Sequence, residues 1–575
     1  MRIIQPSLVN EDDYSGRWRF LLVLILVSMT VLIGRAVYLQ VLDRQFLKQQ
    51  GDLRHVGVLP VPAHRGRIID RNGELLAVST PVKSIWVNPK EFLKAEVNAD
   101  QIKAMADLVG MPAKELLKRI GQDENRGFVY IKRRMNPELV DQAIALGLPG
   151  VYGEREYRRY YPTGEVTAHL LGFTDIEDKG QEGMELAFDD SLRGLEGAKR
   201  IIRDGKRRII EDLENIRLPE PGKDLTLSID ERLQYLAYRE LKKAVIQHRA
   251  RSGSLVLLDT QNGEVLAMVN QPSYNPNSRL KMKGNASRNR AITDLYEPGS
   301  TMKPFAVACA LELGLTRPDS VFSTNGQMHV GHNIVKDVHN YGTLDVAHIL
   351  QKSSNVGVTK IALSVPPKKF WAFYNNLGFG QAPDTGFPGE ATGRLADYRG
   401  WNAFEQATLS FGYGVATSTL QLGRAYLSLA NNGVIPMVSL LKRTAPAETH
   451  RIMSAKTATT VRTMLEGVVT REGTAIKASI PGFRVAGKTG TVKKSGSHGY
   501  TDSLYMSLFT GIAPASKPRL VMVVMIDEPS AGEYYGGAVA APVFSSVMEG
   551  ALRLLNIAPD EPASPLMAGR QDEPA

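Results

Sequence analysis

Apolar residues are concentrated near the N-terminus of this chain. Residues 20–33 are an uninterrupted, uncharged run rich in Leu, Val and Ile, and Arg35 follows shortly after. Trp18 and Tyr38 lie twenty residues apart, so a helix would separate them by about 30 Å, which matches a bilayer core with its aromatic belts. We therefore predict a membrane anchor at about 17–42, with Arg35 able to reach the interface beyond the apolar core.

A cleaved signal peptide is the main alternative to an anchor. No small-x-small cleavage site follows the apolar run, so an uncleaved anchor is favoured. Charge does not settle the orientation of the anchor, because basic residues lie on both sides: Arg2, Arg17 and Arg19 before it, and Arg35, Arg44 and Lys48 after it.

The next region, 43–222, has mixed α/β patterning without a catalytic motif, and it ends in the Pro- and Gly-rich segment 218–222. Within it, 199–210 is the densest basic stretch. Asp204-Gly205 separates two short β-branched runs there, which predicts a hairpin with a solvated basic face. Nucleic-acid binding is disfavoured, since no recognised module or interleaved aromatic residues accompany the charge. An anionic lipid or a cell-wall polymer is the more natural neighbour.

The region 223–557 reads as strands at both ends with helices between them. Its predicted elements are a helix at 230–248, an Asn262-Gly263 hairpin joining strands 254–258 and 264–269, strands 505–511 and 520–526, and a closing helix at 542–555. This order predicts an antiparallel sheet with helices. Residues 1–16 are expected to be a short polar tail, and 558–575, rich in Pro and polar residues, a disordered one.

Composition limits the possible folds and functions of the chain only slightly. A chain of 575 residues is long enough for two or more domains, and its net charge of +10 is spread along the sequence. The single cysteine, Cys309, excludes an internal disulfide and is expected to pack in the core. His329, His332 and His339 cluster without a metal-binding pattern, and there is no phosphate or dinucleotide fingerprint, so neither metal nor cofactor is predicted.

Candidate chemistry lies in three short motifs: Ser300-Thr301-Met302-Lys303, Ser353-Ser354-Asn355 and Lys488-Thr489-Gly490. Each is common by chance, but in this order they outline a serine acyl-transfer site. Ser300 follows a turn and opens an apolar helical pattern that stops at Gly314. We expect Ser300 to cap this helix, with Lys303 beside it on one face.

Decoys show how weak each motif is alone. Ser278 and Lys281 have the same spacing as Ser300 and Lys303, but they lie in a polar, loop-like segment. The segments 273–275 and 323–325 also read Ser-x-Asn.

Each motif residue has a chemical use. Serine needs a base, and Lys303 can serve if burial and a second cation, Lys488, lower its pKa. Ser353 is a candidate proton relay, and the Asn355 amide a ligand for a lysine amine or a substrate amide. Lys488 and Thr489 would fix a substrate carboxylate.

The last expectation concerns backbone groups that would lie close to the substrate. Gly490 would allow close approach of a substrate backbone to the strand. The N–H groups of Ser300 and Thr491 would form an oxyanion hole.

The chain resembles class B penicillin-binding proteins, and within them the cell-division transpeptidases. Beyond the three motifs, the resemblance rests on these segments: His64 to Gly73 with Leu76-Ala77, Arg159 to Pro162 with Gly164, His169 and Gly172, Gly183 to Glu185, Ser410 to Gly414, and Asp527 to Pro529. It extends from about Arg17 to about Leu555.

The resemblance implies a multidomain α+β protein with an N-terminal transmembrane helix. An elongated non-catalytic dimerisation or pedestal module (43–222) and a serine β-lactamase-like transpeptidase domain (223–557) would follow. It also implies a single-pass inner-membrane protein with a cytoplasmic tail and a periplasmic catalytic domain.

The implied activity is cross-linking of peptidoglycan stem peptides at the septum through an acyl-enzyme, with β-lactams as inhibitors. The implied partner is a membrane polymerase of the shape, elongation, division and sporulation family. An elongation transpeptidase, a D,D-carboxypeptidase and a β-lactam sensor share the motifs and remain alternatives.

Overall fold

The structure, a computed structural model, describes residues 13–48, 56–122, 126–203, 209–278, 284–496 and 499–561. It divides into two compact units. One contains residues 1–63 and 195–221, and the other contains 64–194 and 222–575.

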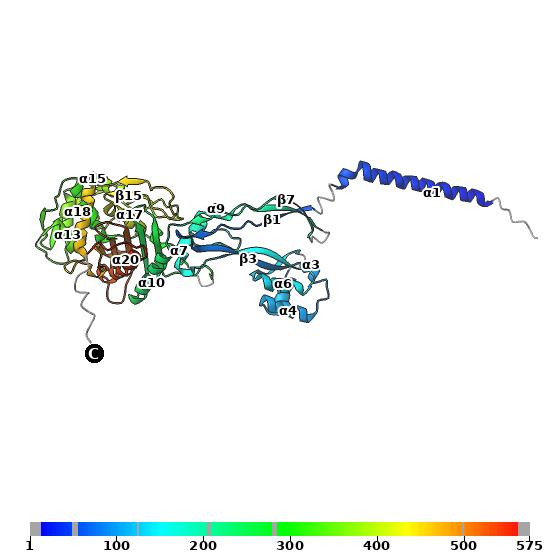
Figure 1. Cartoon of the computed structure of the whole chain (residues 1–575), viewed down its shortest axis with the longest axis horizontal. Coiled ribbons are helices and arrows are strands. Elements are labelled where there is room, and N and C mark those ends of the chain that lie inside the picture. Colours follow the sequence, from blue (N-terminus) through cyan, green and yellow to red (C-terminus); the bar gives the residue numbers. More distant parts are fainter. Residues whose placement is uncertain are drawn as a thin grey trace, which may run out of the picture. The chain divides into compact units, whose positions relative to one another are not determined.

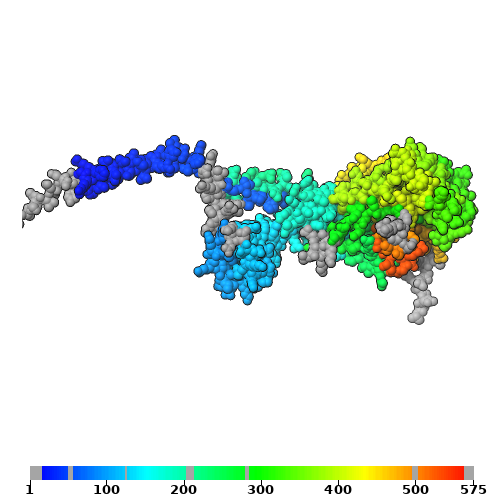
Figure 2. All heavy atoms as spheres, turned by 180° about the vertical axis from the view of Figure 1, so that it is seen from behind, coloured from blue at the N-terminus to red at the C-terminus, as the bar shows by residue number. Residues whose placement is uncertain are grey.

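The first unit contains the predicted anchor. Helix α1 (Asp13–Val37) continues into a π-helical turn, η1 (Tyr38–Leu42) (Figure 1). Within the described residues it is the one helix long and apolar enough to cross a membrane, over Gly16–Leu42, and none of that stretch is buried. Figure 2 shows its side chains, in dark blue, uncovered along the face in view. An apolar helix without a protein partner suits a lipid environment.

A three-stranded antiparallel sheet completes this unit, in the order β1-β6-β7. Its strands are β1 (Val56–Val61), β6 (Gly197–Arg203) and β7 (Ile209–Arg217). The antiparallel pairing of β6 with β7 confirms the predicted basic hairpin. Its turn, 204–208, lies outside the described residues.

The second unit begins with a mixed sheet in the order β4-β3-β2-β8, and β5 also pairs with β3. Its strands are β2 (Ile68–Ile69), β3 (Leu75–Val87), β4 (Val129–Met135), β5 (Val151–Tyr160) and β8 (Leu225–Thr226). Its helices are α3 (Pro89–Phe92), α4 (Ala99–Val109), α5 (Ala113–Gly121), α6 (Pro137–Ala145), η2 (Gly164–Val166), α7 (Ala168–Leu171), α8 (Gly183–Ala187) and α9 (Asp189–Arg193).

Helices α4 and α6 each begin after an asparagine that caps the first turn. Asn98 and Asn136 each accept a backbone N–H of the first turn, and Pro137 occupies the first helical position of α6. These helices pack on β3, β4 and β5 in a small apolar core of their own.

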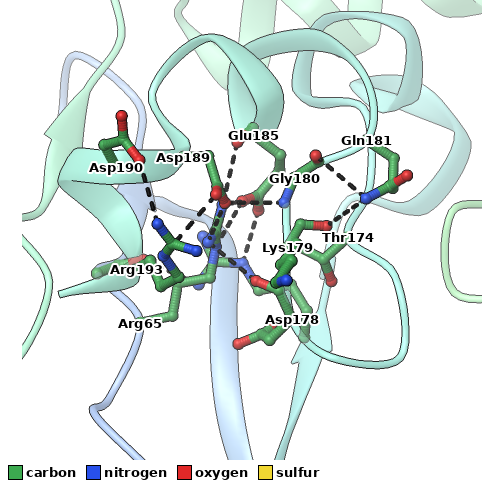
Figure 3. Close-up of polar contacts among 12 residues, drawn as sticks. Arg65, Thr174, Asp178, Lys179, Gly180, Gln181, Glu185, Asp189, Asp190 and Arg193 are labelled. Atoms are coloured by element: carbon green, nitrogen blue, oxygen red, sulfur yellow. Dashed lines mark hydrogen bonds and ion pairs between the residues drawn. The ribbon is translucent and has the colours of Figure 1, made fainter. Parts of the chain in front are cut away.

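A buried ion-pair network joins three segments on which the family resemblance rests (Figure 3). Glu185 Oε2 accepts hydrogen bonds from Arg65 Nε and Nη2 at 2.8 and 2.6 Å, and Glu185 Oε1 accepts one from Arg159 Nε at 2.6 Å. Arg65 also pairs with Asp189 at 2.7 Å. Arg65, Arg159 and Glu185 are almost fully buried, so their mutual pairing offsets the cost of removing the charges from water.

The catalytic region is built on a five-stranded antiparallel sheet in the order β10-β9-β19-β18-β17. Its strands are β9 (Ser252–Asp259), β10 (Val265–Gln271), β17 (Ala486–Gly496), β18 (Gly499–Ala513) and β19 (Leu520–Asp527). The predicted hairpin and the two later strands are therefore confirmed. Strand β17 lies at the edge, so among the described residues its outer side has no strand partner in this sheet.

Helices cover both faces of this sheet. Helices α10 (Glu231–Gln247) and α20 (Ala541–Leu554) pack on one face, and α17 (Thr419–Ala430) on the other (Figure 1). Both predicted helices, at 230–248 and 542–555, are confirmed to within a residue at each end. Asp230 caps α10 by accepting the N–H of Arg232.

Smaller elements surround the sheet and the three helices packed on it. The helices are α11 (Arg290–Thr293), η4 (Gly299–Met302), α12 (Lys303–Glu312), α13 (Val346–Lys352), α14 (Asn355–Leu363), α15 (Pro367–Asn376), η5 (Tyr398–Gly400), α16 (Ala403–Ser410), α18 (Ala455–Glu466), η6 (Gly467–Val469), η7 (Ile476–Ala478) and α19 (Gly536–Val539). The strand pairs are β11 (Val321–Ser323) with β14 (Thr343–Asp345), β12 (Gln327–Val330) with β13 (Asn333–Lys336), and β15 (Val434–Pro436) with β16 (Thr449–Arg451).

The predicted disordered tail needs a correction at its start. Asp560 accepts hydrogen bonds from the Arg484 and Ser516 backbone N–H groups at 2.8 and 3.1 Å, so residues 558–561 are held against the catalytic region. An acidic residue among polar neighbours is typical of a solvated tail, whereas this carboxylate pairs with two backbone donors. Residues 562–575 lie outside the described residues.

Candidate active site

Ser300 lies in a tight 3₁₀ turn that leads directly into α12. Turn η4 spans Gly299–Met302, and α12 starts at Lys303 and ends at Glu312, two residues before Gly314. The Ser300 side chain is half-buried and does not cap the helix. The expectation that it is an N-cap is therefore wrong, because the turn places Ser300 inside a helical element and not before one.

The serine turn requires two glycines: Gly299 within it and Gly412 in the segment packed against it. Gly299 has a φ of +58°, and a Cβ built on it would lie 2.4 Å from the Val492 side chain. The Gly299 N–H donates to the Gly412 carbonyl at 3.2 Å, and a Cβ on Gly412 would lie 2.1 Å from the Gly299 oxygen. The segment 410–414 thus supports the serine turn through backbone contact that any side chain would break.

Lys303 points from the first turn of α12 into the second motif. Its Nζ lies 3.0 Å from Ser353 Oγ and also contacts the Ser353 carbonyl, and the side chain is fully buried. Ser353 has a φ of +60°, in the left-handed region, at the end of α13. A non-glycine residue held in this conformation is strained, which is common at functional sites.

Asp337 fixes the rest of the second motif. Its carboxylate accepts hydrogen bonds from Ser354 Oγ at 2.6 Å and from the Val356 N–H at 3.0 Å, and it also accepts the Asn355 N–H. A carboxylate at the N-terminus of α14 is favoured by the helix dipole. Sequence reasoning missed Asp337, because it lies eighteen residues before Asn355 and no motif includes it.

The Asn355 side chain turns to the neighbouring hairpin. Its Nδ2 donates to the Lys336 carbonyl at 3.0 Å. Asn355 is the first residue of α14.

The third motif lies on β17, beside the serine turn. A Cβ built on Gly490 would lie 3.0 Å from the Pro298 carbonyl oxygen, so glycine allows the strand to approach the turn. Thr489 Oγ1 lies 2.8 Å from Thr474 Oγ1, and Thr491 Oγ1 accepts the Gly536 N–H at 3.0 Å. Thr474 and Gly536 are further site residues that sequence reasoning missed.

Two buried lysines dominate the electrostatics. Burial lowers the pKa of Lys488 to about 7. Burial, and next the nearby Lys488 cation, lower the pKa of Lys303 well below its usual value, against a smaller opposing effect of the Asp337 carboxylate. The lowered pKa favours the neutral form of Lys303, which is the form that a general base needs.

The decoy motif has no comparable surroundings. The Ser278 backbone N–H donates to the Asn275 carbonyl in a local turn, and Lys281 lies outside the described residues. Cys309, by contrast, is buried in α12 as predicted.

Comparison with known protein families shows to which family the chain belongs. The description "Penicillin binding protein transpeptidase domain" matches residues 253–549, and "Penicillin-binding Protein dimerisation domain" matches residues 60–227. The chain belongs to the penicillin-binding transpeptidases. All three motifs fall within the transpeptidase match, and the Arg65–Glu185 ion pair falls within the dimerisation match.

Relatives extend the likeness to nearly the whole chain. The chain is 44% identical to "Peptidoglycan D,D-transpeptidase FtsI" of Escherichia coli, over 97% of this chain and 95% of that one. It is 43% identical to "Probable peptidoglycan D,D-transpeptidase PenA" of Neisseria meningitidis, over 95% and 94%.

A solved structure shows the same architecture. Penicillin binding protein 3 of Mycobacterium tuberculosis, solved in complex with aztreonam, superposes with a TM-score of 0.69 at 27% identity, covering 88% of this chain and 99% of that chain. The predicted resemblance to class B penicillin-binding proteins is confirmed. The apolar N-terminal helix, the one candidate span among the residues that the structure describes, fits a membrane-anchored penicillin-binding transpeptidase.

Proposed function

We propose that this protein is a peptidoglycan D,D-transpeptidase of cell division that works through an acyl-enzyme on Ser300. The observation that supports it most is the position of Lys303. This lysine is fully buried, has a lowered pKa, and bridges the serine turn to Ser353, with a second buried lysine nearby. A strongly perturbed base beside a nucleophile suits acyl transfer better than a structural role.

Acylation begins with neutral Lys303 taking the proton of the Ser300 hydroxyl. The oxygen attacks the carbonyl between two terminal D-alanines, and the N–H groups of Ser300 and Thr491 stabilise the oxyanion. The C–N bond then breaks. The leaving D-alanine amine takes the proton back from Lys303, with the Ser353 hydroxyl as relay.

Transfer reverses these proton movements. An amine of a neighbouring strand attacks the ester, Lys303 accepts its proton, and Ser300 leaves as the alcohol. Lys488 and Thr489 bind the donor's terminal carboxylate, and Asn355 binds a substrate amide. Gly490 leaves room for the donor backbone at β17.

The nucleophile is tested with a fluorescent penicillin. Wild-type chain should be labelled, and Ser300→Ala should lose the label while keeping the wild-type melting temperature. Ser278→Ala is the matched control and should be labelled normally. Label retained in Ser300→Ala, or lost in Ser278→Ala, would refute the site.

Turnover separates an enzyme from a sensor. With a thioester or peptide donor ending in D-alanine and a D-amino-acid acceptor, the detergent-solubilised protein should form the transfer product repeatedly. Acylation by penicillin without turnover of any donor would indicate a sensor. Hydrolysis preferred despite abundant acceptor would indicate a carboxypeptidase.

We also place the catalytic region in the periplasm, with a membrane polymerase of the division machinery as partner. The relative named FtsI and the apolar N-terminal helix support this assignment. Helix contacts in lipid would keep the enzyme near newly made strands and raise their local concentration. Depletion in the native host should give filaments without septa. Rounded cells would indicate elongation instead.

A further inference from the structure

Four aromatic side chains gather on one face of the sheet formed by β3, β4 and β5. Ile85 lies in the apolar core that α4 and α6 cover, so the next residue, Trp86, points to the opposite face of β3. The centroid of the Trp86 ring lies 4.5 Å from that of Tyr152 and 4.7 Å from that of Phe128. The Tyr130 ring meets the Phe128 ring edge to face, with centroids 4.7 Å apart. We call these four rings the aromatic strip.

Pairing between strands explains only part of the aromatic strip. Trp86 and Tyr152 lie directly opposite each other on β3 and β5, and such cross-strand pairs stabilise a sheet. Phe128 precedes the first residue of β4, and 42% of its surface is exposed to solvent. It extends the row of rings beyond the paired strands and leaves an apolar ring in water. Exposed apolar clusters of this kind mark interaction sites.

Hydrogen-bonding groups border the aromatic strip. The Tyr130 hydroxyl donates to Glu154 Oε2 at 2.7 Å, and the Tyr152 hydroxyl donates to Glu91 Oε2 at 2.8 Å. Sugar rings pack their C–H faces on aromatic rings, and their hydroxyl groups bond to carboxylate and hydroxyl oxygens at the edge. The strip therefore has the two kinds of group that recognise a polysaccharide.

A cavity of about 450 Å³ adjoins the aromatic strip along the edge strand β4. Tyr130 belongs to both, since it also lines the cavity. The cations Arg119, Lys132 and Arg133 line it as well, and among the described residues no acidic side chain does so. A concave surface lined by charges of one sign attracts a ligand of the opposite sign, so this cavity suits an anion.

Two of these three cations are not compensated by a carboxylate. Arg133 pairs with Glu156 and Glu177, and its charge is therefore neutralised locally. Lys132 Nζ donates to the Val109 carbonyl at 2.6 Å, and Arg119 is exposed on α5. Neither Lys132 nor Arg119 forms an ion pair within the part of the chain that the structure describes. Both can bind a carboxylate of a ligand.

An aromatic strip with a polar border, next to a cationic cavity, fits a polysaccharide that carries carboxylates. The polymer on which the proposed activity works has both features. Its glycan strand is a chain of sugar rings, and the stem peptides attached to that strand carry carboxylate groups. A neutral polysaccharide would leave the charge of the cavity unused, and an acidic protein segment would leave the sugar-like pairing of rings and hydroxyl groups unused.

We propose that the aromatic strip and the adjoining cavity bind a peptidoglycan glycan strand together with its acidic stem peptides, at a site in the non-catalytic module and separate from Ser300. This inference rests on the proposed function and adds a second polymer-binding site to it. A strand held at this second site raises the local concentration of stem peptides for the catalytic region of the same molecule.

The test measures binding of soluble, uncross-linked glycan strands that carry stem peptides to the detergent-solubilised protein, after penicillin has acylated Ser300. With the active site blocked, the wild-type protein should still bind the strands. Phe128→Ala and Arg119→Met should each weaken this binding about tenfold, through loss of one aromatic contact or one charge-assisted hydrogen bond. The matched controls are Tyr235→Ala, at an exposed aromatic residue of α10, and Lys118→Met, at the exposed cation next to Arg119, and both should bind like wild type.

A neutral N-acetylglucosamine oligomer separates the contributions of the strip and the cavity. Because it carries no carboxylate, it should bind Arg119→Met as it binds wild type, and it should lose binding to Phe128→Ala. Phe128→Tyr keeps the ring and should bind both ligands like wild type, which covers the case in which Phe128→Ala fails to fold.

No binding of the strands by the acylated wild-type protein, or binding that Phe128→Ala and Arg119→Met leave unchanged, would overturn the site. A polyglutamate peptide that binds as tightly as the strands and displaces them would overturn it too, and would assign the surface to an acidic protein partner. A chain that penicillin does not acylate would refute the proposed function alone. The same titrations on Ser300→Ala then decide the glycan site.

Discussion

Replacing Lys488 by methionine should stabilise the protein at neutral pH. Its ordinary pKa is 10.5 and burial lowers it to about 7. The unfolded chain therefore binds more protons than the folded one between these values, and stability rises with pH there. At pH 7 the lysine is fully charged in the unfolded chain and half charged in the folded one. The pKa difference of about three units between the two states lowers the free energy of unfolding by about 4 kcal/mol. A methionine side chain is of similar length and carries no such cost.

The gain should nearly vanish in alkali. At pH 10 the unfolded lysine is itself losing its proton, so the remaining difference is about 1 kcal/mol. In a catalytic region of this size roughly 2 °C accompanies each kcal/mol, so Lys488→Met should raise the melting temperature by about 8 °C at pH 7 and by about 2 °C at pH 10. Calorimetry of the detergent-solubilised chain measures both.

Lys494 on the same strand is the matched control. Contacts with Asp527 and Glu528 outweigh its burial and raise its pKa, so its charge stabilises the fold below the ordinary pKa, and this contribution is lost only as pH rises through the raised value. Lys494→Met should therefore lower the melting temperature at pH 7. The reasoning would be refuted by a Lys488→Met chain that melts at a lower temperature than wild type at pH 7, or by a shift in melting temperature that is the same at both pH values.

Three further predictions concern the site and its support. Acylation kcat/KM by penicillin should rise with pH as Lys303 loses its proton, at a pH well below the usual pKa of a lysine, and should fall as Lys488 loses its proton near pH 7; a profile without a falling limb near pH 7 would contradict this. Asp337→Asn should slow acylation about tenfold or more and move the rising limb to lower pH, because that carboxylate holds Asn355 and raises the pKa of Lys303; an unchanged rate and limb would count against it. Glu185→Gln should cost about 3–5 kcal/mol in urea unfolding, because two buried arginines lose their anion; a loss under about 1 kcal/mol would show that they find other partners.

Local patterns predicted most of the catalytic fold. The Asn262-Gly263 turn between apolar runs specified its hairpin, and the periodic stretches at 230–248 and 542–555 became helices, because these signals depend on neighbouring residues alone. The three motifs were found for the same reason. That the three motifs lie close together in the fold was inferred from the family resemblance. Motifs separated by about fifty residues or more along the sequence carry no information about their distance in space.

Contacts between distant residues escaped prediction. Asp337 resembles any loop aspartate until the structure places it at the start of α14. Arg65 and Glu185 were recognised as parts of separate segments, but a pair separated by 120 positions cannot be read from a pattern. The helix cap expected at Ser300 failed because Gly299 allows a left-handed step that starts the turn one residue earlier.

Two buried clusters of charged side chains in the second unit differ in whether their charges are compensated by a counter-ion. This difference distinguishes a structural cluster from a reactive one. Arg65 and Arg159 share the carboxylate of Glu185, so each charge is compensated and the cluster can hold segments together without reacting. Lys303 and Lys488 have no carboxylate bound to them in the described residues, and burial lowers the pKa of each. Supplying a carboxylate to Lys303 would stabilise the fold and restore its proton, which would remove the base. The destabilisation at these lysines is thus a requirement of the reaction, and the large apolar core around them sustains it.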